Sequence, residues 1–225
     1  MLLKVEGVTK VYGKGDNEFV ALQDVSLNVD RGQTVAIIGK SGSGKSTLMH
    51  VLAALDRVDS GKIVFDDQSY SRLSAAALDH LRSKKFGFIF QQFFLNGRET
   101  VLENVMLPLK IAGVGRGERR KRAMQALEEV DLIDKVNSKA ADLSGGQKQR
   151  VAVARALVND PEVIFADEPT GNLDSENGHR VINLLFKLNK EKNITVILVT
   201  HDHELAAMCG RQFSMKDGKL SEAAL

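Results

Sequence analysis

Residues 39–47 have the clearest chemical pattern in the chain, a glycine-rich loop that ends in lysine, serine and threonine. Its members are Gly39, Lys40, Ser41, Gly42, Ser43, Gly44, Lys45, Ser46 and Thr47. Glycines at this spacing let successive backbone amides converge on phosphate oxygens at a helix N-terminus. Lys45 adds a positive charge for the β- and γ-phosphates, and the Ser46 hydroxyl is a ligand for Mg²⁺. A plain glycine-rich turn is the alternative, but the position between an apolar run and a helical pattern predicts a nucleoside triphosphate site.

Two adjacent carboxylates, Asp167 and Glu168, follow a second apolar run at residues 163–166. Charges at the end of a buried strand cost desolvation unless a cation compensates them, and Mg²⁺ is the expected cation. We expect Asp167 to hold the metal through its water shell. Because side chains alternate along a strand, Glu168 should point the other way and polarise the attacking water. Ion pairs with basic residues elsewhere are the alternative interpretation.

A third pattern lies at the start of a helical segment and comprises Leu143, Ser144, Gly145, Gly146 and Gln147. A serine before two glycines offers an anion a hydroxyl, exposed amides and the positive end of a helix dipole. An ordinary helix cap explains the same residues equally well.

Short apolar runs and helical patterns alternate along the chain and indicate the elements that position these residues. The runs at 35–38, 163–166 and 196–199 are continuous, as in parallel strands covered on both faces. The first thirty residues alternate instead, at 3–8 and 21–29, which favours an antiparallel sheet at one edge. Further helical patterns cover 75–84, 116–130 and 145–158.

The predicted fold class is therefore α/β, a P-loop NTPase core with a mainly parallel sheet, an N-terminal antiparallel β edge and a helical insertion lobe. We expect a single domain over residues 1–225. Its core would comprise residues 1–70 and 161–225, and its helical lobe about 71–160.

Composition narrows the class of protein further. Hydrophobic residues make up 43% and charged residues 27%, as in ordinary soluble proteins, and no apolar run approaches the roughly 20 residues that cross a bilayer. The start lacks a secretory apolar segment, so we expect a cytoplasmic protein. A net charge of +2 argues against a nucleic-acid partner. The single cysteine, Cys209, is expected to be structural, and the basic run at 116–122 is either a solvated helix start or a contact for acidic lipid headgroups.

The ordered set of motifs resembles the nucleotide-binding subunits of ABC transporters over nearly the whole chain. The set includes the loop at 39–47, residues 143–147, Asp167 with Glu168, residues 172–174 and residues 200–202. Residues 167–174 are most similar to the branch that serves macrolide export, lipoprotein release, peptide-antibiotic resistance and cell division. The resemblance implies ATP hydrolysis with ATP and Mg²⁺, an ATP-dependent homodimer, and an integral membrane permease-type subunit as partner at the inner face of the cell membrane.

The resemblance also implies roles that spacing does not give. Tyr12 would stack on adenine, although by itself it could be a strand residue that packs on the sheet. Gln91 would contact Mg²⁺ and the attacking water while its loop senses the membrane partner; without the family it is a polar strand end. His201 would contact the γ-phosphate, where an isolated histidine favours structural hydrogen bonding. The implied catalytic set is Glu168, His201, Gln91 and Lys45, and the implied metal ligands are Ser46, Gln91 and Asp167.

Several residues would act across the dimer. Asp174 would link the two ATP sites, and Ser144, Gly145, Gly146 and Gln147 would serve the ATP bound to the opposite subunit. An isolated subunit should then be a poor ATPase, because half of each phosphate's donors come from the other chain.

The departures from the family pattern are few. Many relatives have a leucine- and proline-containing segment where this chain has residues 93–100. In the family this region docks the membrane subunit, so the difference bears on which membrane partner is bound and not on the chemistry. Lys40 and Lys148 lie where other residues are commoner in the family. Phosphate contact requires neither of these two lysine side chains. A signalling or mechanical device in cell division without transport remains an alternative. A soluble ABC ATPase acting on DNA or the ribosome is disfavoured by the absence of sustained heptads, and a binding-only regulator by the presence of Glu168 and His201.

Overall fold

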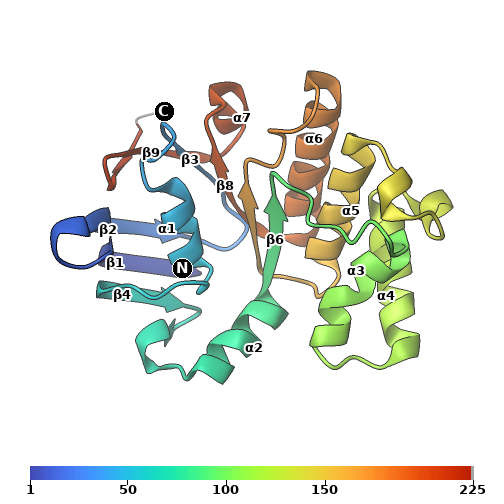
Figure 1. The fold of residues 1–225 in the computed structure, drawn as a ribbon, viewed down its shortest axis with the longest axis horizontal. Helices are drawn as coiled ribbons and strands as arrows, with labels where there is room; N and C mark the ends of the chain where they lie inside the picture. Colours follow the sequence, from blue (N-terminus) through green and yellow to red (C-terminus); the bar gives the residue numbers. More distant parts are fainter. Residues whose placement is uncertain (224–225) are drawn as a thin grey trace. The chain divides into compact units, whose positions relative to one another are not determined.

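The computed structural model describes residues 1–223, in which strands and helices alternate (Figure 1). The strands are β1 (Leu3–Tyr12), β2 (Phe19–Val29), β3 (Thr34–Ile38), β4 (Ser60–Phe65), β5 (Gln68–Ser69), β6 (Phe86–Phe90), β7 (Val163–Asp167), β8 (Thr195–Thr200), β9 (Arg211–Lys216) and β10 (Lys219–Glu222). The helices are α1 (Lys45–Leu52), α2 (Ala75–Lys85), α3 (Val101–Ile111), α4 (Arg116–Glu129), α5 (Gly145–Leu157), α6 (Ser175–Lys192) and α7 (His203–Ala207). The α/β class predicted from the sequence is confirmed.

The chain forms two compact units. The first combines Met1–Asp79 with the segment that begins at Thr195, and the second is His80–Ile194. The second unit therefore contains β6, β7 and α6 as well as most of the helices that we expected in a lobe at about 71–160. The predicted single domain, with its core and lobe boundaries, stays a prediction.

The first unit contains an antiparallel sheet in the order β2-β1-β4-β5. Strand β1 pairs with β2 from Leu3 opposite Val29 to Tyr12 opposite Phe19. Its alternating apolar residues, such as Leu3 and Val5, are buried, which is the pattern of a sheet with one covered face. The antiparallel edge expected from the first thirty residues is thus present.

The same unit contains β3 between β8 and β9, with both neighbours parallel to it and β10 antiparallel to β9. The apolar residues at 35–37 and 196–199 are fully buried, which explains why their sequences are continuous and do not alternate. Helix α7 contacts β3 and β8, and α1 contacts β8.

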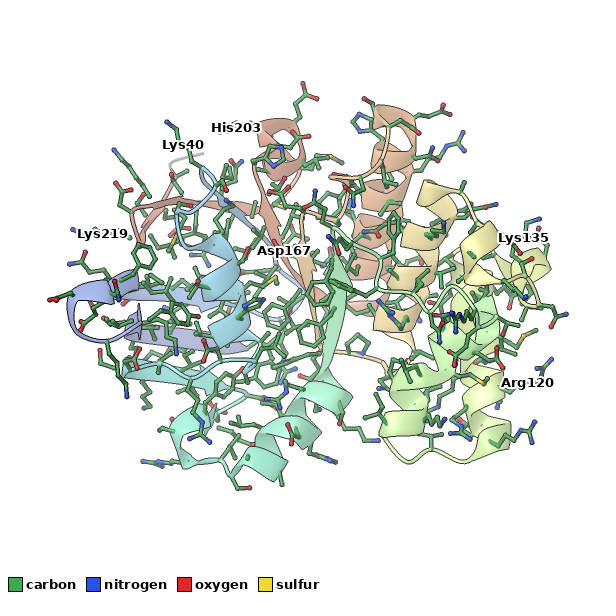
Figure 2. The ribbon with its side chains drawn as sticks, in the orientation of Figure 1. Lys40, Arg120, Lys135, Asp167, His203 and Lys219 are labelled. Carbon is green, nitrogen blue, oxygen red and sulfur yellow. The ribbon has the colours of Figure 1, made fainter. Side chains whose placement is uncertain are left out.

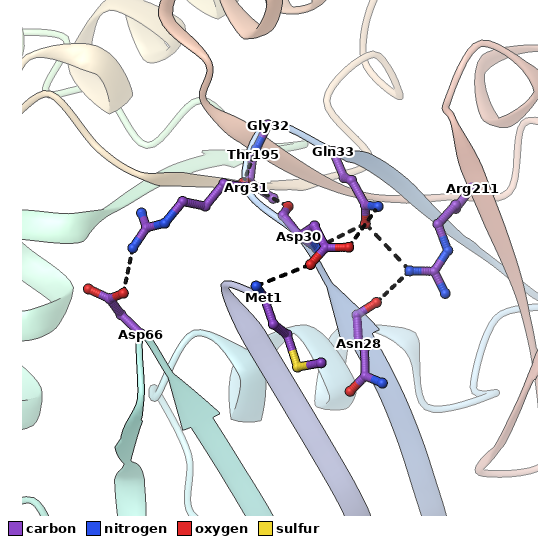
Figure 3. A network of polar contacts seen from close by, with 9 residues as sticks. All are labelled: Met1, Asn28, Asp30, Arg31, Gly32, Gln33, Asp66, Thr195 and Arg211. Atoms are coloured by element: carbon purple, nitrogen blue, oxygen red, sulfur yellow. Dashed lines mark hydrogen bonds and ion pairs between the residues drawn. The ribbon is translucent and has the colours of Figure 1, made fainter.

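A polar network surrounds the turn between β2 and β3 (Figure 3). The Gly32 amide donates a hydrogen bond to Thr195 Oγ1 over 2.9 Å. The Arg211 guanidinium donates to the Asn28 carbonyl oxygen over 2.5 Å. These bonds tie the end of β2 to β8 and β9, so the strand that leads into the glycine-rich loop is fixed from both sides.

In the second unit β6 and β7 pair in parallel, from Phe86 opposite Val163 to Phe90 opposite Asp167. Helix α5 contacts β6 and the three helices α3, α4 and α6, so it is the central helix of this unit. Helices α2, α4 and α5 match the three helical patterns of the sequence to within one residue at each end.

Helix α3 was not predicted. It begins with a capping box, in which Thr100 Oγ1 accepts from the Glu103 amide and the Glu103 carboxylate accepts from the Thr100 amide. Pro108 lies inside the helix, where it removes a backbone donor and hides the helical pattern. Over residues 1–223, none of the helices has both the length and the apolar character that crossing a bilayer requires.

Candidate functional site

The glycine-rich loop at 39–47 joins the end of β3 to the first turn of α1. Gly44 precedes α1 with φ 105°, and a Cβ there would lie 2.5 Å from the Ala21 carbonyl oxygen. At Gly39 a Cβ would lie 2.3 Å from the Met215 carbonyl oxygen. Only glycine fits these two positions, because a side chain would meet backbone atoms of neighbouring strands.

The loop presents unpaired donors for an anion. Among residues 1–223 no side chain caps α1, so its first amides point out of the helix. The Ser43 hydroxyl is buried and has no hydrogen-bond partner among residues 1–223. Leaving such a group unsatisfied costs about 1–3 kcal/mol, which a phosphate oxygen would remove. The loop therefore fits a phosphate group.

Lys45 lies inside the loop. Its side chain is buried, and Nζ donates to the Lys40 carbonyl oxygen over 2.9 Å. The partner of this ammonium group is an uncharged backbone carbonyl. The role of Lys45 at the phosphates stays a prediction.

His201 follows β8 directly, and its side chain is exposed. In the parallel pair, Ile38 of β3 lies opposite Thr200 of β8. The glycine-rich loop and His201 therefore leave the same carboxyl edge of one sheet, although they are about 160 residues apart in sequence. The next residue, Asp202, accepts from the Glu204 and Leu205 amides and caps α7.

Tyr12 is the last residue of β1, and 40% of it is exposed. Its hydroxyl donates to Asp56 Oδ2 over 2.7 Å, and Lys10 Nζ lies 4.9 Å from the ring centroid. The ring is thus neither buried in the sheet nor loose in solvent. This arrangement agrees with a ring that can stack on a ligand.

Asp167 ends β7 (Figure 2), and Glu168 is the first residue beyond that strand. Glu168 has φ 47°, in the left-handed region. Our alternation argument for the direction of Glu168 is therefore wrong, since alternation holds only for extended backbone. The Glu168 carbonyl oxygen accepts from the Gly171 amide over 3.0 Å, so a tight turn sets the position of this carboxylate.

Gln91 follows β6 as Glu168 follows β7, and the register of Phe90 opposite Asp167 brings their loops to one edge. The Asn172 amide Nδ2 donates to the Gln91 carbonyl oxygen over 2.8 Å. A Cβ at Gly171 would lie 2.8 Å from Gln91 Nε2. The glutamine side chain is therefore packed against the turn that carries Glu168.

The sequence did not identify Gln149 as part of this arrangement. It is fully buried in α5, and its Nε2 donates to the Pro169 carbonyl oxygen over 2.5 Å and to the Phe90 carbonyl oxygen over 3.3 Å. One amide thus binds the ends of both strands that lead to Gln91 and Glu168. The sequence feature that could have identified Gln149 is a polar residue on the apolar face of a predicted helix.

Ser144 caps α5, as the helix-cap interpretation predicted. Its hydroxyl accepts from the Gln147 amide over 3.3 Å, and its own amide donates to Gln147 Oε1 over 3.0 Å. The amides of Gly145 and Gly146 remain in the first turn, where a helix has no acceptors for them. The anion-binding interpretation of this helix start stays a prediction.

Asp174 caps α6 in the same unit. Its carboxylate accepts from the Asn177 backbone amide over 2.8 Å and from Asn177 Nδ2 over 2.7 Å. The backbone hydrogen bond from Asn177, followed by the side-chain bond, lowers the pKa of Asp174 below its ordinary value. Asp174 is therefore a carboxylate held in a fixed direction at neutral pH.

The structure brings the predicted residues together in two groups. In the first unit these are the residues of the glycine-rich loop, Tyr12 and His201; in the second unit they are Gln91, Ser144, Gly145, Gly146, Gln147, Asp167, Glu168 and Asp174. Each group lies at strand ends or helix starts, where backbone amides and side chains are available to a ligand.

Comparisons with known proteins give consistent matches. The family model described as ABC transporter matches residues 22–171. The chain is 48% identical over 219 residues to the macrolide export ATP-binding/permease protein MacB of Hyphomonas neptunium. The aligned region covers 97% of this chain and 34% of that protein. It thus spans about a third of that relative. It is 45% identical to an uncharacterized ABC transporter ATP-binding protein of Methanocaldococcus jannaschii, over 98% of each.

Two solved structures of one cassette are similar to the whole chain. They are titled as the dimeric structure of MJ0796, a bacterial ABC transporter cassette, and as a dimeric post-hydrolysis state of that cassette bound to ADP and Pi. Each has a TM-score of 0.90 and 43% identity, and covers 100% of this chain and 99% of the other.

Proposed function

Because this chain belongs to the ABC transporter family, we propose that it drives a separate membrane subunit by pairing head to tail with a second copy around two ATP molecules. The chain binds nucleotide and hydrolyses ATP. The observation that carries the proposal is the uncapped start of α1 within the glycine-rich loop, beside the buried Ser43 hydroxyl. A triphosphate satisfies both at once.

We assign the phosphates to the amides of residues 39–47, with Lys45 as the charge that stabilises the transferring group. Phosphoryl transfer needs positioning and charge stabilisation more than covalent chemistry. Glu168 is the base that orients the attacking water, Gln91 assists it, and His201 contacts the γ-phosphate. The fixed turn at Glu168 supports this assignment, because a base is effective only within hydrogen-bond reach of its water.

Mg²⁺ fits the oxygen donors that we assign to it, namely the Ser46 hydroxyl, the Gln91 amide and the Asp167 carboxylate. Within residues 1–223 no three His, Cys, Asp or Glu side chains cluster as a metal site. This agrees with the preference of Mg²⁺ for one or two carboxylates completed by phosphates and water. When bound, the ion neutralises charge on the β- and γ-phosphates.

Ser144, Gly145, Gly146 and Gln147 serve the ATP of the opposite subunit in this proposal, and Asp174 links the two sites. The exposed cap residue Ser144 at the start of α5 and the fixed direction of Asp174 support it. Two structures of a similar cassette are titled as dimeric, which supports the pairing of two copies.

The membrane partner docks on the loop after Gln91. Phe94 is 64% exposed, and the half-buried Arg155 guanidinium donates to the Phe93 and Phe94 carbonyl oxygens over 2.8 and 2.6 Å, which holds the loop. A relative named as an ATP-binding/permease protein supports a permease-type partner at the inner face of the cell membrane. A mechanical device without transport would use the same ATP chemistry. It would differ from a transporter only in the membrane partner that the chain drives.

Glu168→Gln tests the proposal. The variant should bind ATP, lose nearly all turnover, and become an ATP-dependent dimer in size-exclusion chromatography with light scattering. Glu191→Gln, an exposed carboxylate on α6, is the matched control and should behave like the parent chain. Parent-like hydrolysis by Glu168→Gln would remove the assigned base. A variant that binds ATP and remains monomeric would remove the pairing.

A further inference from the structure

Tyr12 belongs to a compact polar cluster between the end of β1 and the loop after α1. The Tyr12 hydroxyl donates to Asp56 Oδ2 over 2.7 Å. The other oxygen, Asp56 Oδ1, accepts from Lys10 Nζ over 3.0 Å and from the Arg57 amide over 2.7 Å. Lys10 Nζ also donates to the Arg57 carbonyl oxygen over 2.7 Å. Both carboxylate oxygens of Asp56 are therefore occupied, and one of them is committed to the phenol.

The protonation states keep this cluster intact at neutral pH. Burial raises the pKa of Asp56, but the hydrogen bonds from Tyr12, Lys10 and the Arg57 amide outweigh it and lower the pKa below the ordinary value. Burial and the bond to Asp56 raise the pKa of Tyr12. The phenol thus remains a donor and the carboxylate remains an acceptor.

One face of the Tyr12 ring is already occupied. Lys10 Nζ lies 4.9 Å from the ring centroid, and Lys10 is only 8% exposed, so it cannot leave that face without losing its ion pair. The exposed 40% of Tyr12 leaves part of its surface available to a planar ligand. The cation also attracts the ring face electrostatically, which favours this arrangement.

The cluster connects this ring to the helix that begins at the phosphates. Asp56 follows the end of α1, and its amide donates to the His50 carbonyl oxygen over 3.3 Å. The ring is therefore linked through Asp56 to the C-terminal end of α1. Because α1 begins at the glycine-rich loop, one helix connects the ring to the proposed phosphate site.

We propose that Asp56 and Lys10 are positioning residues that preset the Tyr12 ring for stacking on the adenine of ATP. The inference rests on the proposed adenine role of Tyr12. A tyrosine that is held at its hydroxyl and at one ring face has little rotational freedom before the ligand binds. Ordering the ring on binding therefore reduces the stacking free energy by less. Asp56 acts through Tyr12 and does not touch the nucleotide.

The test compares equilibrium binding of ATP with binding of inorganic triphosphate, which has no base. Asp56→Asn and Tyr12→Phe should each weaken ATP binding by about fivefold, the size expected when one side chain must be ordered on binding, and leave triphosphate binding unchanged. The double variant should be no weaker than either single one. Asp59→Asn is the matched control, because Asp59 Oδ2 binds the Val11 amide and not the phenol, and it should match the parent chain.

Two results would overturn the positioning role. One is an equal loss of ATP and triphosphate affinity in Asp56→Asn, which would mean that the fold of the loop is damaged. The other is a full additional loss when Asp56→Asn is added to Tyr12→Phe, which would mean that Asp56 does not act through the hydroxyl.

Tyr12→Ala separates this inference from the proposed function beneath it. Loss of a base-stacking aromatic should weaken ATP binding roughly 5- to 150-fold. If Tyr12→Ala binds ATP like the parent, the adenine role of Tyr12 is wrong. If Tyr12→Ala weakens ATP binding and Asp56→Asn does not, the stacking role stands and only the positioning by Asp56 is wrong.

Discussion

The α-carbon of Gly146 lies against the side chain of Asn177, so closely that a Cβ at 146 would be 2.6 Å from Asn177 Oδ1. The same Asn177 donates from Nδ2 to Asp174 over 2.7 Å. The start of α5 and the cap of α6 are thus linked through one amide. These are the two segments that we expect to face the opposite subunit, so a change at one should displace the other.

Gly146→Ala should destabilise the unliganded protein through this contact. Overpacking of a close contact costs about 1–3 kcal/mol, and each kcal/mol lowers Tm by about 2–4 °C in a domain of this size. Thermal unfolding measures the shift. Adding Asn177→Ala, which removes the obstructing amide, should recover part of the lost Tm. If the double variant is as unstable as the sum of the two single variants, the contact is not the cause.

Gln149→Leu should lower both stability and ATPase activity. It leaves the Phe90 and Pro169 carbonyl oxygens without their shared donor, at about 1–3 kcal/mol for an unsatisfied buried group. Leucine also removes Gln149 Oε1, which is buried without a partner within residues 1–223, so the net loss should be near the lower value. Lys148→Gln, the next residue on the same helix, is the control and should leave Tm and turnover unchanged. Parent-like turnover by Gln149→Leu would show that strand-end positioning is unimportant.

Lys45→Ala should lose nucleotide affinity itself. Loss of a charged hydrogen bond of about 1.5–3 kcal/mol predicts roughly a 10- to 100-fold weaker Kd for ATP. Equilibrium binding measures it. Lys40→Ala is the control, because Lys40 contributes its backbone carbonyl and its side chain is exposed. Tight ATP binding by Lys45→Ala would contradict the assignment of the glycine-rich loop.

Phe94→Ala should uncouple the membrane partner without changing basal ATPase activity of the isolated chain. The side chain is 64% exposed, and its backbone is held by Arg155, so the substitution removes contact surface and leaves the loop in place. Co-purification from detergent-solubilised membranes with a tagged chain measures the partner. Ile133→Ala, another exposed apolar residue of the same unit, is the control. Normal recovery of the partner by Phe94→Ala would count against this docking surface.

The sequence predicted those parts of the fold that depend on local pattern. The buried strands at 35–38 and 196–199 are recognisable because continuous apolar runs are typical of covered strands. The glycine-rich loop is recognisable because Gly39 and Gly44 leave no room for a side chain. The structural role of Cys209 was predicted as well. Its thiol is buried, and burial raises its pKa to about 12.

The sequence did not predict features that depend on tertiary contact. The clamp of Asn172 on Gln91 and the bridge by Gln149 join residues about 60 to 80 positions apart, and no local pattern encodes them. Helix α3 is a different case. Its signal, Thr100 followed by Glu103, was present, and Pro108 obscured it.

Glu168 occupies a left-handed backbone conformation, at φ 47°, that costs a residue with a long side chain about 1–3 kcal/mol. Glycine or asparagine would tolerate the same turn more readily. A laboratory selection for thermal stability alone should therefore replace glutamate at this position. The most heat-resistant variants would bind ATP without hydrolysing it. Retention of glutamate in such an experiment would require a simultaneous demand for turnover.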